Sequence, residues 1–577
     1  MKTLTSACSE NLDLKNPLSE YPRMYLKRDS YLSLNGEWEY QIVKDNETVN
    51  HQNWQMIIVP FAIGSKLSCA KDTTLGIDET LYYRKRFSYP YSNHKVILNF
   101  EAVDQEATVY LNGNFVGEHF GGYAPFSLDV TDSIEEQNEL IVKVKDYSDT
   151  GIYAYGKQKL EHGGMWYTPS SGIWQSVWME ELKDESIEDL KITTDYDNRA
   201  VYLSLAGKFD QAVITVFANK KLVHRGITSE KSYTITLDDI HPWSVEDPFL
   251  YDLYIATSEE TIKSYFGIRK ISKRRDDRGI MRFYLNDKPV FLSGLLDQGY
   301  YVDGLLTCPS ELTMLNELTK IKEMGFNMLR MHVKIESRRF YYLCDKLGLL
   351  VMQDMPNGGG PYDFNFVALK PNLGFKNVDD HQYKLFGRAS KESREMYYME
   401  LSDMLNNLYN FPSIIAWVPF NEGWGQFDSE KVTKYIRDYD STRLIDSASG
   451  WYDQNAGDFN SIHNYFFKFR VPKQDDRILL LSEFGGYSYL EKEHSEAEKV
   501  YGYRKFKDRL SLAEAIQKLY EKQIIPNIPK GLSGCIYTQV SDVQDECNGI
   551  FTEDKKMIKI DKKKMKKIND RCQRSLY

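Results

Sequence analysis

Residues 290–296 read VFLSGLL and residues 326–331 read FNMLRM, two apolar runs of strand length that flank an amphipathic segment. Ser310 can cap a helix in that segment, and Gly325 can end it. The expected helix carries one slowly drifting apolar stripe, formed by Leu312, Leu315, Leu318, Ile321 and Met324. The stretch therefore predicts a strand, a helix and a second strand, which is the repeating unit of a parallel sheet.

This alternation of strand and helix continues towards residue 577. Six more apolar runs of strand length follow, at residues 349–352, 414–420, 443–445, 459–462, 478–481 and 532–536. Eight strands in about 300 residues indicate a (β/α)8 TIM barrel, whose catalytic groups lie at the C-terminal ends of the strands. A doubly wound α/β sheet is the alternative, although no strand is followed by G-x-G-x-x-G or by a P-loop. Residues 357–390 are polar and Gly-rich, and we expect a long loop over the barrel mouth there.

From about residue 31 to residue 272, the chain has the short alternating runs of antiparallel β structure instead. The run VYL at 109–111 leads into Asn112-Gly113, a dipeptide that favours a type I′ hairpin, so the first module predicts a β-sandwich. The second module keeps the alternation, and its length of about 90 residues matches an immunoglobulin-like sandwich. We therefore expect three domains, at residues 1–182, 183–272 and 273–577.

Composition excludes several classes of protein. The chain has 577 residues, 42% hydrophobic and 27% charged, as soluble globular proteins do. Its net charge of -10 argues against nucleic-acid binding. No window approaches the about 18 apolar residues of a membrane span, and residues 1–10 lack a signal-peptide stretch. Seven cysteines without C-x-x-C spacing disfavour a disulfide framework and a zinc site, so we expect a reducing, cytoplasmic location.

Two glutamates follow predicted barrel strands. SIIAWVPF (413–420) runs into Asn421-Glu422, and ILLLS (478–482) runs into Glu483 three strands later. Strands four and seven lie on opposite sides of a barrel mouth, so the two carboxylates can bracket a sugar. Hydrolysis of a glycosidic bond needs such a pair, one to protonate the leaving oxygen and one to attack the anomeric carbon, with about 5 to 5.5 Å between them for net retention. Glu422 is the candidate acid.

Other polar residues near strand ends fit supporting roles in binding the substrate. Asn421 can donate a hydrogen bond to the sugar hydroxyl beside the reacting carbon. Arg330 can hold Glu483 ionised, because a nearby cation lowers a carboxylate pKa, and His332 points into the same mouth. Arg330 and His332 could equally serve structure alone, as an ion-pair partner and a satisfied hydrogen-bonding group. Five further candidates lie at or near strand ends: Asp297, Asp354, His463, Tyr465 and Tyr537.

Short motifs occur along the chain in a specific combination: YPR (21–23), LNGEW (34–38), YLNG (110–113), SGIW (171–174), YFGIR (265–269), Asn421-Glu422 and SEFG (482–485). Together they resemble glycoside hydrolase family 2, the family of β-galactosidases, β-glucuronidases and β-mannosidases, over nearly the whole chain. The resemblance implies an N-terminal jelly-roll domain that binds sugar, an immunoglobulin-like domain and a catalytic barrel. It also implies Glu422 as the acid and base and Glu483 as the nucleophile of a retaining double displacement.

The chain departs from parts of this family pattern. Leu296-Asp297-Gln298-Gly299 stands where the large β-galactosidases have a segment rich in His and Glu, so no metal site is carried over. Tyr537 stands where many relatives place a Trp. Near Asn548, the Asn-x-Lys that binds the sugar carboxylate in β-glucuronidases lacks its Lys. A glucuronide is therefore disfavoured, unless another cation such as Lys334 or Arg338 supplies the contact.

These features predict an exo-β-glycosidase that needs no cofactor and whose partner is a carbohydrate, with neither nucleic acid nor membrane involved. A terminal β-galactoside is the leading substrate, because that activity is common among similar proteins. A β-glucuronidase or another β-glycosidase of the family is the alternative. A carbohydrate-binding protein without turnover is the rival from another class, and the presence of both glutamates counts against it. One sequence leaves the oligomeric state open, a homo-oligomer included.

Overall fold

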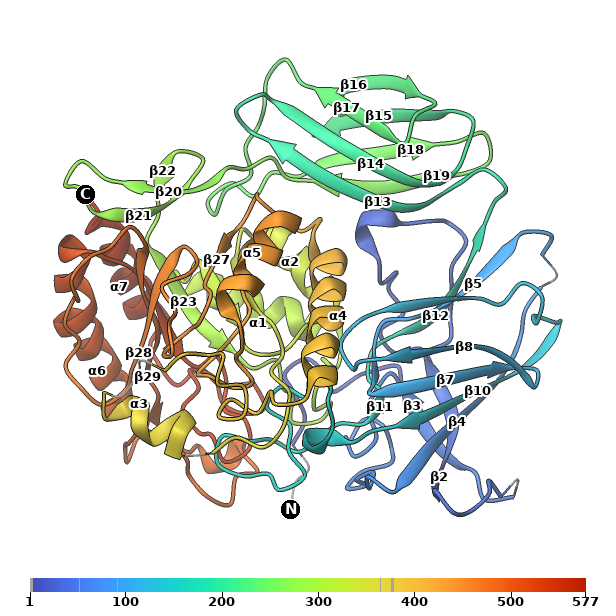
Figure 1. The fold of residues 1–577 in the computed structure, drawn as a ribbon, viewed down its shortest axis with the longest axis horizontal. Coiled ribbons are helices and arrows are strands. Elements are labelled where there is room, and N and C mark those ends of the chain that lie inside the picture. Colours follow the sequence, from blue (N-terminus) through green and yellow to red (C-terminus); the bar gives the residue numbers. More distant parts are fainter. Residues whose placement is uncertain (1–3, 51, 91, 364, 375–377) are drawn as a thin grey trace.

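The computed structural model describes residues 4–50, 52–90, 92–363, 365–374 and 378–577, and these form three domains (Figure 1). A barrel lies on one side of the molecule, the N-terminal sheets lie on the other, and a second β-sandwich lies above them in this view. The predicted fold class, two β-sandwiches followed by a TIM barrel, is confirmed. None of the described helices is long and apolar enough to span a membrane.

The N-terminal domain is a sandwich of two antiparallel sheets. The larger sheet consists of β3 (Gln55–Val59), β2 (Gly36–Lys44), β4 (Glu79–Ser88), β10 (Gln137–Lys145), β7 (Glu106–Leu111) and β8 (Asn114–Phe120), in that order. The smaller sheet consists of β1 (Leu32–Ser33), β12 (Val177–Leu182), β5 (Lys95–Phe100) and β9 (Phe126–Asp129). Between β7 and β8, Asn112 and Gly113 have φ angles of 52° and 81°, which agrees with the predicted type I′ hairpin.

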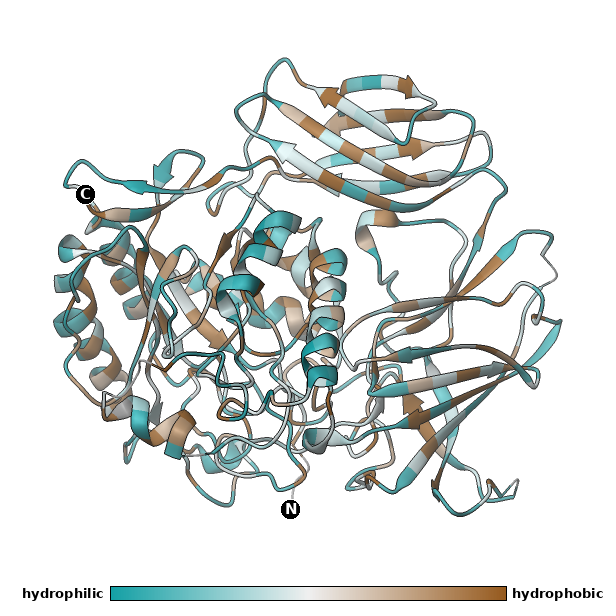
Figure 2. Cartoon of the chain, viewed as in Figure 1, coloured by the Kyte–Doolittle hydropathy of each residue, from teal (hydrophilic) through white to brown (hydrophobic). Residues whose placement is uncertain are grey.

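The second domain is a smaller sandwich. One sheet consists of β13 (Ser186–Asp195), β14 (Ala200–Lys208) and β17 (Ser232–Thr236), and the other of β16 (Lys221–Thr228), β15 (Ala212–Ala218), β18 (Tyr251–Ala256) and β19 (Thr261–Phe266). Figure 2 shows hydrophobic and hydrophilic residues alternating along these strands, because neighbouring side chains of a strand face opposite sides. A ribbon of β20 (Ile271–Arg275), β21 (Met281–Leu285) and β22 (Lys288–Pro289) leads into the barrel. The predicted boundary at residue 272 lies within β20.

The third domain is a barrel of eight parallel strands, as predicted. In sequence order these are β23 (Leu292–Asp297), β24 (Met328–Met331), β25 (Leu350–Asp354), β26 (Ile414–Val418), β27 (Leu444–Ile445), β28 (Phe459–Asn464), β29 (Ile478–Gly485) and β32 (Leu532–Thr538). The described helices of the domain are α1 (Glu311–Glu323), α2 (Arg338–Leu347), α3 (Lys370–Asn372), α4 (Lys391–Leu408), α5 (Ser429–Tyr439), α6 (Arg509–Leu519) and α7 (Lys562–Arg574). Strand pairing runs in sequence from β23 to β27, and from β23 through β32 and β29 to β28.

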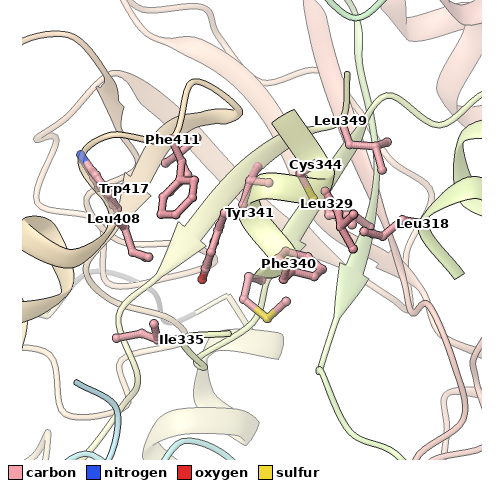
Figure 3. Packing of buried hydrophobic residues seen from close by; sticks show 14 of the residues in the cluster. Leu318, Leu329, Ile335, Phe340, Tyr341, Cys344, Leu349, Leu408, Phe411 and Trp417 are labelled. Carbon is pink, nitrogen blue, oxygen red and sulfur yellow. The ribbon is translucent and has the colours of Figure 1, made fainter. Parts of the chain in front are cut away.

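Side chains alternate between the inside of the barrel and its helical shell. Leu292 and Leu296 of β23 belong to the interior core, whereas Leu295 of the same strand packs outward. The outward residues form the larger core, in which Leu329 of β24 lies close to Phe340 of α2 (Figure 3). This alternation decides which residues at a strand end can reach the mouth of the barrel.

The first predicted helix, α1, differs from its expected pattern in one respect. The Ser310 hydroxyl accepts a hydrogen bond from the Thr313 amide at 3.1 Å, as a cap should, and Gly325 adopts a φ of 79° just after the helix. Leu312, however, is 59% exposed, and the buried face begins at Thr313 and Met314 instead. The apolar stripe drifts around a helix of 3.6 residues per turn, so its first member lies outside the contact with the barrel.

Candidate active site

The two predicted catalytic glutamates meet in the mouth of the barrel. Glu422 follows β26 after a short turn, and Glu483 lies near the C-terminal end of β29. A carboxylate oxygen of each lies within 4.8 Å of the other and of a ring nitrogen of His463. Inverting enzymes separate the two carboxyl groups by about 6.5 to 9.5 Å to admit a water molecule, and retaining ones by about 5 to 5.5 Å. The spacing here fits the retaining class.

The backbone around Glu422 is held in an uncommon conformation. Glu422 has a φ of 51°, which is a left-handed conformation that costs a non-glycine residue about 1 to 3 kcal/mol. Its amide donates to the Ser449 carbonyl at 2.9 Å, and its own carbonyl accepts a hydrogen bond from the Trp451 indole at 3.0 Å. These contacts direct the side chain towards His463, whose Nδ1 lies 2.7 Å from Glu422 Oε1.

Glu483 has more polar neighbours than Glu422. The Tyr465 hydroxyl donates a short hydrogen bond to Glu483 Oε2, and an Arg330 Nη1 atom lies 3.2 Å from Oε1. His463 Nε2 lies 3.4 Å and His332 Nε2 lies 3.6 Å from the same oxygen. Four of the predicted site residues thus surround the proposed nucleophile.

The two carboxyl groups have different proton affinities. Burial raises the pKa of Glu483 to about 7, while the charge of Arg330 and the hydrogen bond from Tyr465 oppose that rise. Burial raises the pKa of Glu422 well above its ordinary value, and the neighbouring charge of Glu483 raises it further. Glu483 therefore ionises first, while Glu422 keeps its proton. That order suits a nucleophile and a general acid respectively.

Arg330 organises the floor of the site. Its Nε and Nη2 atoms each donate to a different oxygen of Asp354 at 2.9 Å, a bidentate pair with both side chains buried. Nη2 also donates to the Asn421 Oδ1 atom at 2.8 Å. Because its oxygen is engaged in this way, Asn421 keeps its Nδ2 donor free of hydrogen bonds among the described residues. Asp354 is thus placed as a partner of Arg330, and Asn421 presents a buried donor.

Two predicted substrate-binding residues, Asp297 and Tyr537, face away from the mouth. Leu296 packs inside the barrel, so Asp297 turns outward, where its carboxylate accepts a hydrogen bond from the Gly299 amide at 2.9 Å. Tyr537 likewise belongs to the outer core, and its ring packs against Phe484 at 5.6 Å. The prediction was wrong by one residue in each case, because adjacent strand residues point to opposite faces.

The neighbours of these two residues take their places. Gln298 Oε1 accepts a hydrogen bond from His332 Nδ1 at 2.9 Å, and Thr538 Oγ1 lies 3.1 Å from the Tyr465 hydroxyl. His332 itself points into the site, since its Nε2 has no hydrogen-bond partner among the described residues. Every second residue of a strand faces the same side. Counting in steps of two from Leu292 and from Gly534 would therefore have identified Gln298 and Thr538.

Sequence reasoning also missed a contribution from the N-terminal domain. Lys157 and Tyr167 lie in the long connection between β10 and β12, and both contact Glu546, which follows β32. Lys157 is near enough for its charge to act on both catalytic carboxyl groups. Residues 157 and 546 are 389 positions apart, and no local pattern marks either.

The two cations considered as alternatives for binding a sugar carboxylate are engaged elsewhere. The Lys334 ammonium donates to the carbonyls of Gly299 and Leu306 and pairs with Glu336. The Arg338 Nε atom donates to Asn407 and lies 3.7 Å from Glu101. Both residues are therefore held by other parts of the protein.

The predicted loop at residues 357–390 packs beside Glu422, although positions 364 and 375–377 lie outside the described residues. Phe366 stacks on Tyr452 with ring centroids 4.7 Å apart. The Val367 carbonyl accepts a hydrogen bond at 3.0 Å from the same Trp451 indole that bonds the Glu422 carbonyl. The loop thus supports the segment that carries the acid.

Two groups of side chains among the described residues have donor atoms close enough to share a cation. One is the catalytic set of Glu422, His463 and Glu483, and the other is Asp379, Asp380 and His381, of which the outer two are exposed. Neither arrangement has the closed shell of a structural metal site. The absence of a metal and of a cofactor from the reaction stays a prediction.

Comparisons with known proteins place the chain among glycosidases. Residues 70–171 match the glycosyl hydrolase 2 galactose-binding domain-like family, residues 184–269 match glycosyl hydrolases family 2, and residues 279–494 match the TIM barrel domain of that family. A β-galactosidase of Thermoanaerobacter pseudethanolicus is 26% identical over 463 residues, which is 73% of this chain and 56% of that protein. A β-glucuronidase of Streptococcus agalactiae is 23% identical over 431 residues, which is 70% of this chain and 68% of that protein.

Solved structures show the same fold at lower identity. A β-glucuronidase of an uncultured Clostridium sp. superposes with a TM-score of 0.74 at 18% identity, and covers 95% of this chain and 99% of its own. The chain spans about half the length of several curated relatives that it matches. The matched families cover all three domains in order, and on that ground the chain belongs to glycoside hydrolase family 2.

Proposed function

We propose that this protein is a retaining exo-β-glycosidase that removes a terminal neutral sugar, with a β-galactoside as its leading substrate. The observation that carries the proposal is the pair of Glu422 and Glu483, whose oxygens lie within 4.8 Å of each other at the barrel mouth. In the first step Glu422 protonates the leaving oxygen while Glu483 attacks the anomeric carbon. In the second step Glu422 takes a proton from a water molecule, whose oxygen attacks the anomeric carbon and displaces the Glu483 carboxylate.

The preference for a neutral sugar is supported by the charges around the site. The Lys of the glucuronide motif is absent, and Lys334 and Arg338 are engaged elsewhere. Lys157, which lies near the catalytic pair, is already paired with Glu546. The seven unpaired cysteines support, in addition, a proposed cytoplasmic location.

Relative rates on different sugars test the substrate class. A uronate carboxylate placed beside Glu546 would be desolvated without a free cation, at a cost of several kcal/mol. We expect kcat/KM for an aryl β-galactoside or β-glucoside to exceed that for the matching β-glucuronide by at least about 100-fold. The relatives include β-glucuronidases. If the β-glucuronide were hydrolysed faster than the neutral glycosides, the protein would be assigned as a β-glucuronidase instead.

Azide rescue tests the roles of the two glutamates. With an aryl glycoside whose leaving group departs unprotonated, Glu422→Ala should still form the glycosyl-enzyme and then stall, because no base activates water. Azide needs no base, so it should restore turnover and release a β-glycosyl azide. Glu483→Ala lacks the nucleophile, and azide should give only the α-configured product.

NMR of the product anomer reads the outcome. Reversed anomers, with the α-azide from Glu422→Ala and the β-azide from Glu483→Ala, would exchange the two roles. Activity at wild-type levels in both variants would show that neither glutamate is the catalyst.

A further inference from the structure

Lys157 and Glu546 form a buried ion pair between two domains beside the active site. The Lys157 ammonium lies 3.0 Å from Glu546 Oε2, and the Tyr167 hydroxyl donates to the same oxygen at 2.5 Å. Tyr167 also lies 3.1 Å from the lysine, so the three groups form a closed triangle. Lys157 and Tyr167 belong to the N-terminal domain, whereas Glu546 follows the last barrel strand.

This triangle leaves one side of Glu546 facing further polar groups. Glu546 Oε1 accepts a hydrogen bond from Asn548 Nδ2 at 3.1 Å. The Asn548 Oδ1 atom is buried and has no hydrogen-bond partner among the described residues. A buried amide oxygen without a partner is unfavourable, so this atom is available to accept a hydrogen bond from a ligand.

The charges of the Lys157–Glu546 pair affect the pKa values of groups in the catalytic centre. Burial raises the pKa of both Glu422 and Glu483, and the positive charge of Lys157 opposes that rise at both. Glu546 adds to the rise at Glu422. Burial and Arg330 lower the pKa of His332, and Lys157 lowers it further. The ion pair therefore lies close enough to the catalytic groups for its charges to act on them.

A row of amides continues from the pair to the nucleophile. Gln539 lies next to Tyr167, and its Oε1 accepts a hydrogen bond from Gln298 Nε2 at 2.6 Å. Gln298 in turn contacts His332, whose unpaired Nε2 points to Glu483. A chain of polar contacts therefore connects the nucleophile to the ion pair.

We propose that Lys157 and Glu546 recognise hydroxyl groups of the terminal sugar, with Lys157 donating to one hydroxyl and Glu546 accepting from another. The proposal rests on the proposed function and names its specificity-determining residues. A sugar diol can both donate and accept, so it can contact a cation and an anion that stay paired with each other. A uronate has only acceptor oxygens at its carboxylate, and Glu546 would repel it.

A double-mutant cycle tests this contact: a charged group is removed from the enzyme, a hydroxyl is removed from the substrate, and the two changes are then combined. The parent aryl β-galactoside is compared with analogues that lack the hydroxyl at C3, C4 or C6, using wild type, Glu546→Gln and Lys157→Met. We expect the variants to lose about 10- to 100-fold in kcat/KM on the parent, as hydrogen bonds to charged groups are lost. On one analogue, variant and wild type should then agree within about threefold, because that hydroxyl has no partner left to lose.

Gln544→Ala is the matched control. Gln544 joins the same two segments, because its Oε1 accepts from the Thr168 amide at 3.1 Å and its Nε2 donates to the Thr168 hydroxyl at 2.9 Å. It is two residues from Glu546 but is only half-buried, whereas Glu546 is buried. We expect Gln544→Ala to keep the wild-type ratio between parent and deoxy substrates, even if it weakens the contact between the domains.

The outcomes separate the two proposals. If Glu546→Gln and Lys157→Met lower kcat/KM by one common factor on all four substrates, the pair only joins the domains and the inference is wrong. If wild type hydrolyses none of the glycosides, the proposed function fails. Calorimetric titration of the galactoside into Glu483→Ala, with and without Glu546→Gln, then tests recognition alone: binding weakened about 10-fold or more supports it, and unchanged binding contradicts it.

Discussion

At the scale of single residues, Glu483 and Glu422 differ in what surrounds them. Glu483 accepts a hydrogen bond from Tyr465 and lies 3.2 Å from Arg330, whereas Glu422 has the His463 ring at 2.7 Å. Donors and cations stabilise the ionised form of a carboxyl group, and burial destabilises it. The chain thus places two identical side chains in environments that separate their proton affinities, as acid and nucleophile require.

Tyr465→Phe should shift the pH profile in one direction. Activity needs Glu483 ionised, so kcat/KM should rise as pH increases through the pKa of Glu483, which burial raises to about 7. The Tyr465 hydrogen bond opposes that rise, so its loss should move the acidic limb to higher pH. We expect kcat/KM to fall by about 10-fold or more at pH 6, and by less at pH 8.

Tyr503→Phe is the control for that shift. Its ring stacks on Tyr465 with centroids 3.8 Å apart. Among the described residues, Tyr465 and not Tyr503 donates a hydrogen bond to Glu483. The acidic limb of this variant should stay at the wild-type position. An unmoved limb in Tyr465→Phe would mean that another group sets the acidic side of the profile.

At the scale of elements, the loop at 357–390 supports the turn that carries the acid. Phe366, which is 4% exposed, stacks on Tyr452, and the Trp451 indole bridges the Val367 and Glu422 carbonyls. The left-handed backbone at Glu422 needs such external support, because that conformation is unfavourable by itself. The position of the Glu422 side chain therefore depends on a segment outside the barrel strands.

Phe366→Ala should lower activity through the position of Glu422. The lost ring contact leaves a cavity beside Tyr452 and loosens the loop, so we expect kcat to fall by about 10-fold with a smaller change in KM. Leu373→Ala alters the same segment at a side chain that is 66% exposed, and it should leave kcat unchanged. Equal effects of the two substitutions on steady-state kinetics would contradict the supporting role.

At the scale of the whole molecule, a buried carboxyl group lies between the N-terminal domain and the barrel. Glu400 of α4 accepts hydrogen bonds from the Ala154 amide at 3.1 and 3.2 Å. Burial raises the pKa of Glu400 to about 7, although the amide opposes the rise. From about pH 4.5 to 7 the folded protein therefore binds a proton that the unfolded chain releases, so stability falls as pH rises through this window.

Glu400→Gln should remove that dependence. The amide carries no charge and can still accept from Ala154, so at pH 8 we expect the variant to be more stable than wild type by up to about 3 kcal/mol, and near wild type at pH 4.5. Thermal unfolding across this pH range measures the effect. Glu395→Gln, at an exposed position of the same helix, should follow the wild-type curve within about 0.5 kcal/mol. If the stability of Glu400→Gln changed with pH in parallel with that of wild type, ionisation of Glu400 would not be the cause of the pH dependence.

The sequence by itself determined the barrel and the position of its catalytic pair. Eight apolar runs predicted eight strands, because a strand covered on both faces must be apolar along its length. Glu422 and Glu483 follow two of these runs, and parallel strands bring their C-terminal ends to one mouth. Both conclusions depend on local patterns, and local patterns can be read from one chain.

Only the tertiary structure decided which neighbours of those glutamates share the pocket. Asp297 and Tyr537 face outward while Gln298 and Thr538 face the site, since a shift of one residue along a strand reverses the face. Lys157 meets Glu546 across 389 positions and two domains. Such a contact leaves no periodicity in the sequence, because it arises from the packing of separate domains against each other.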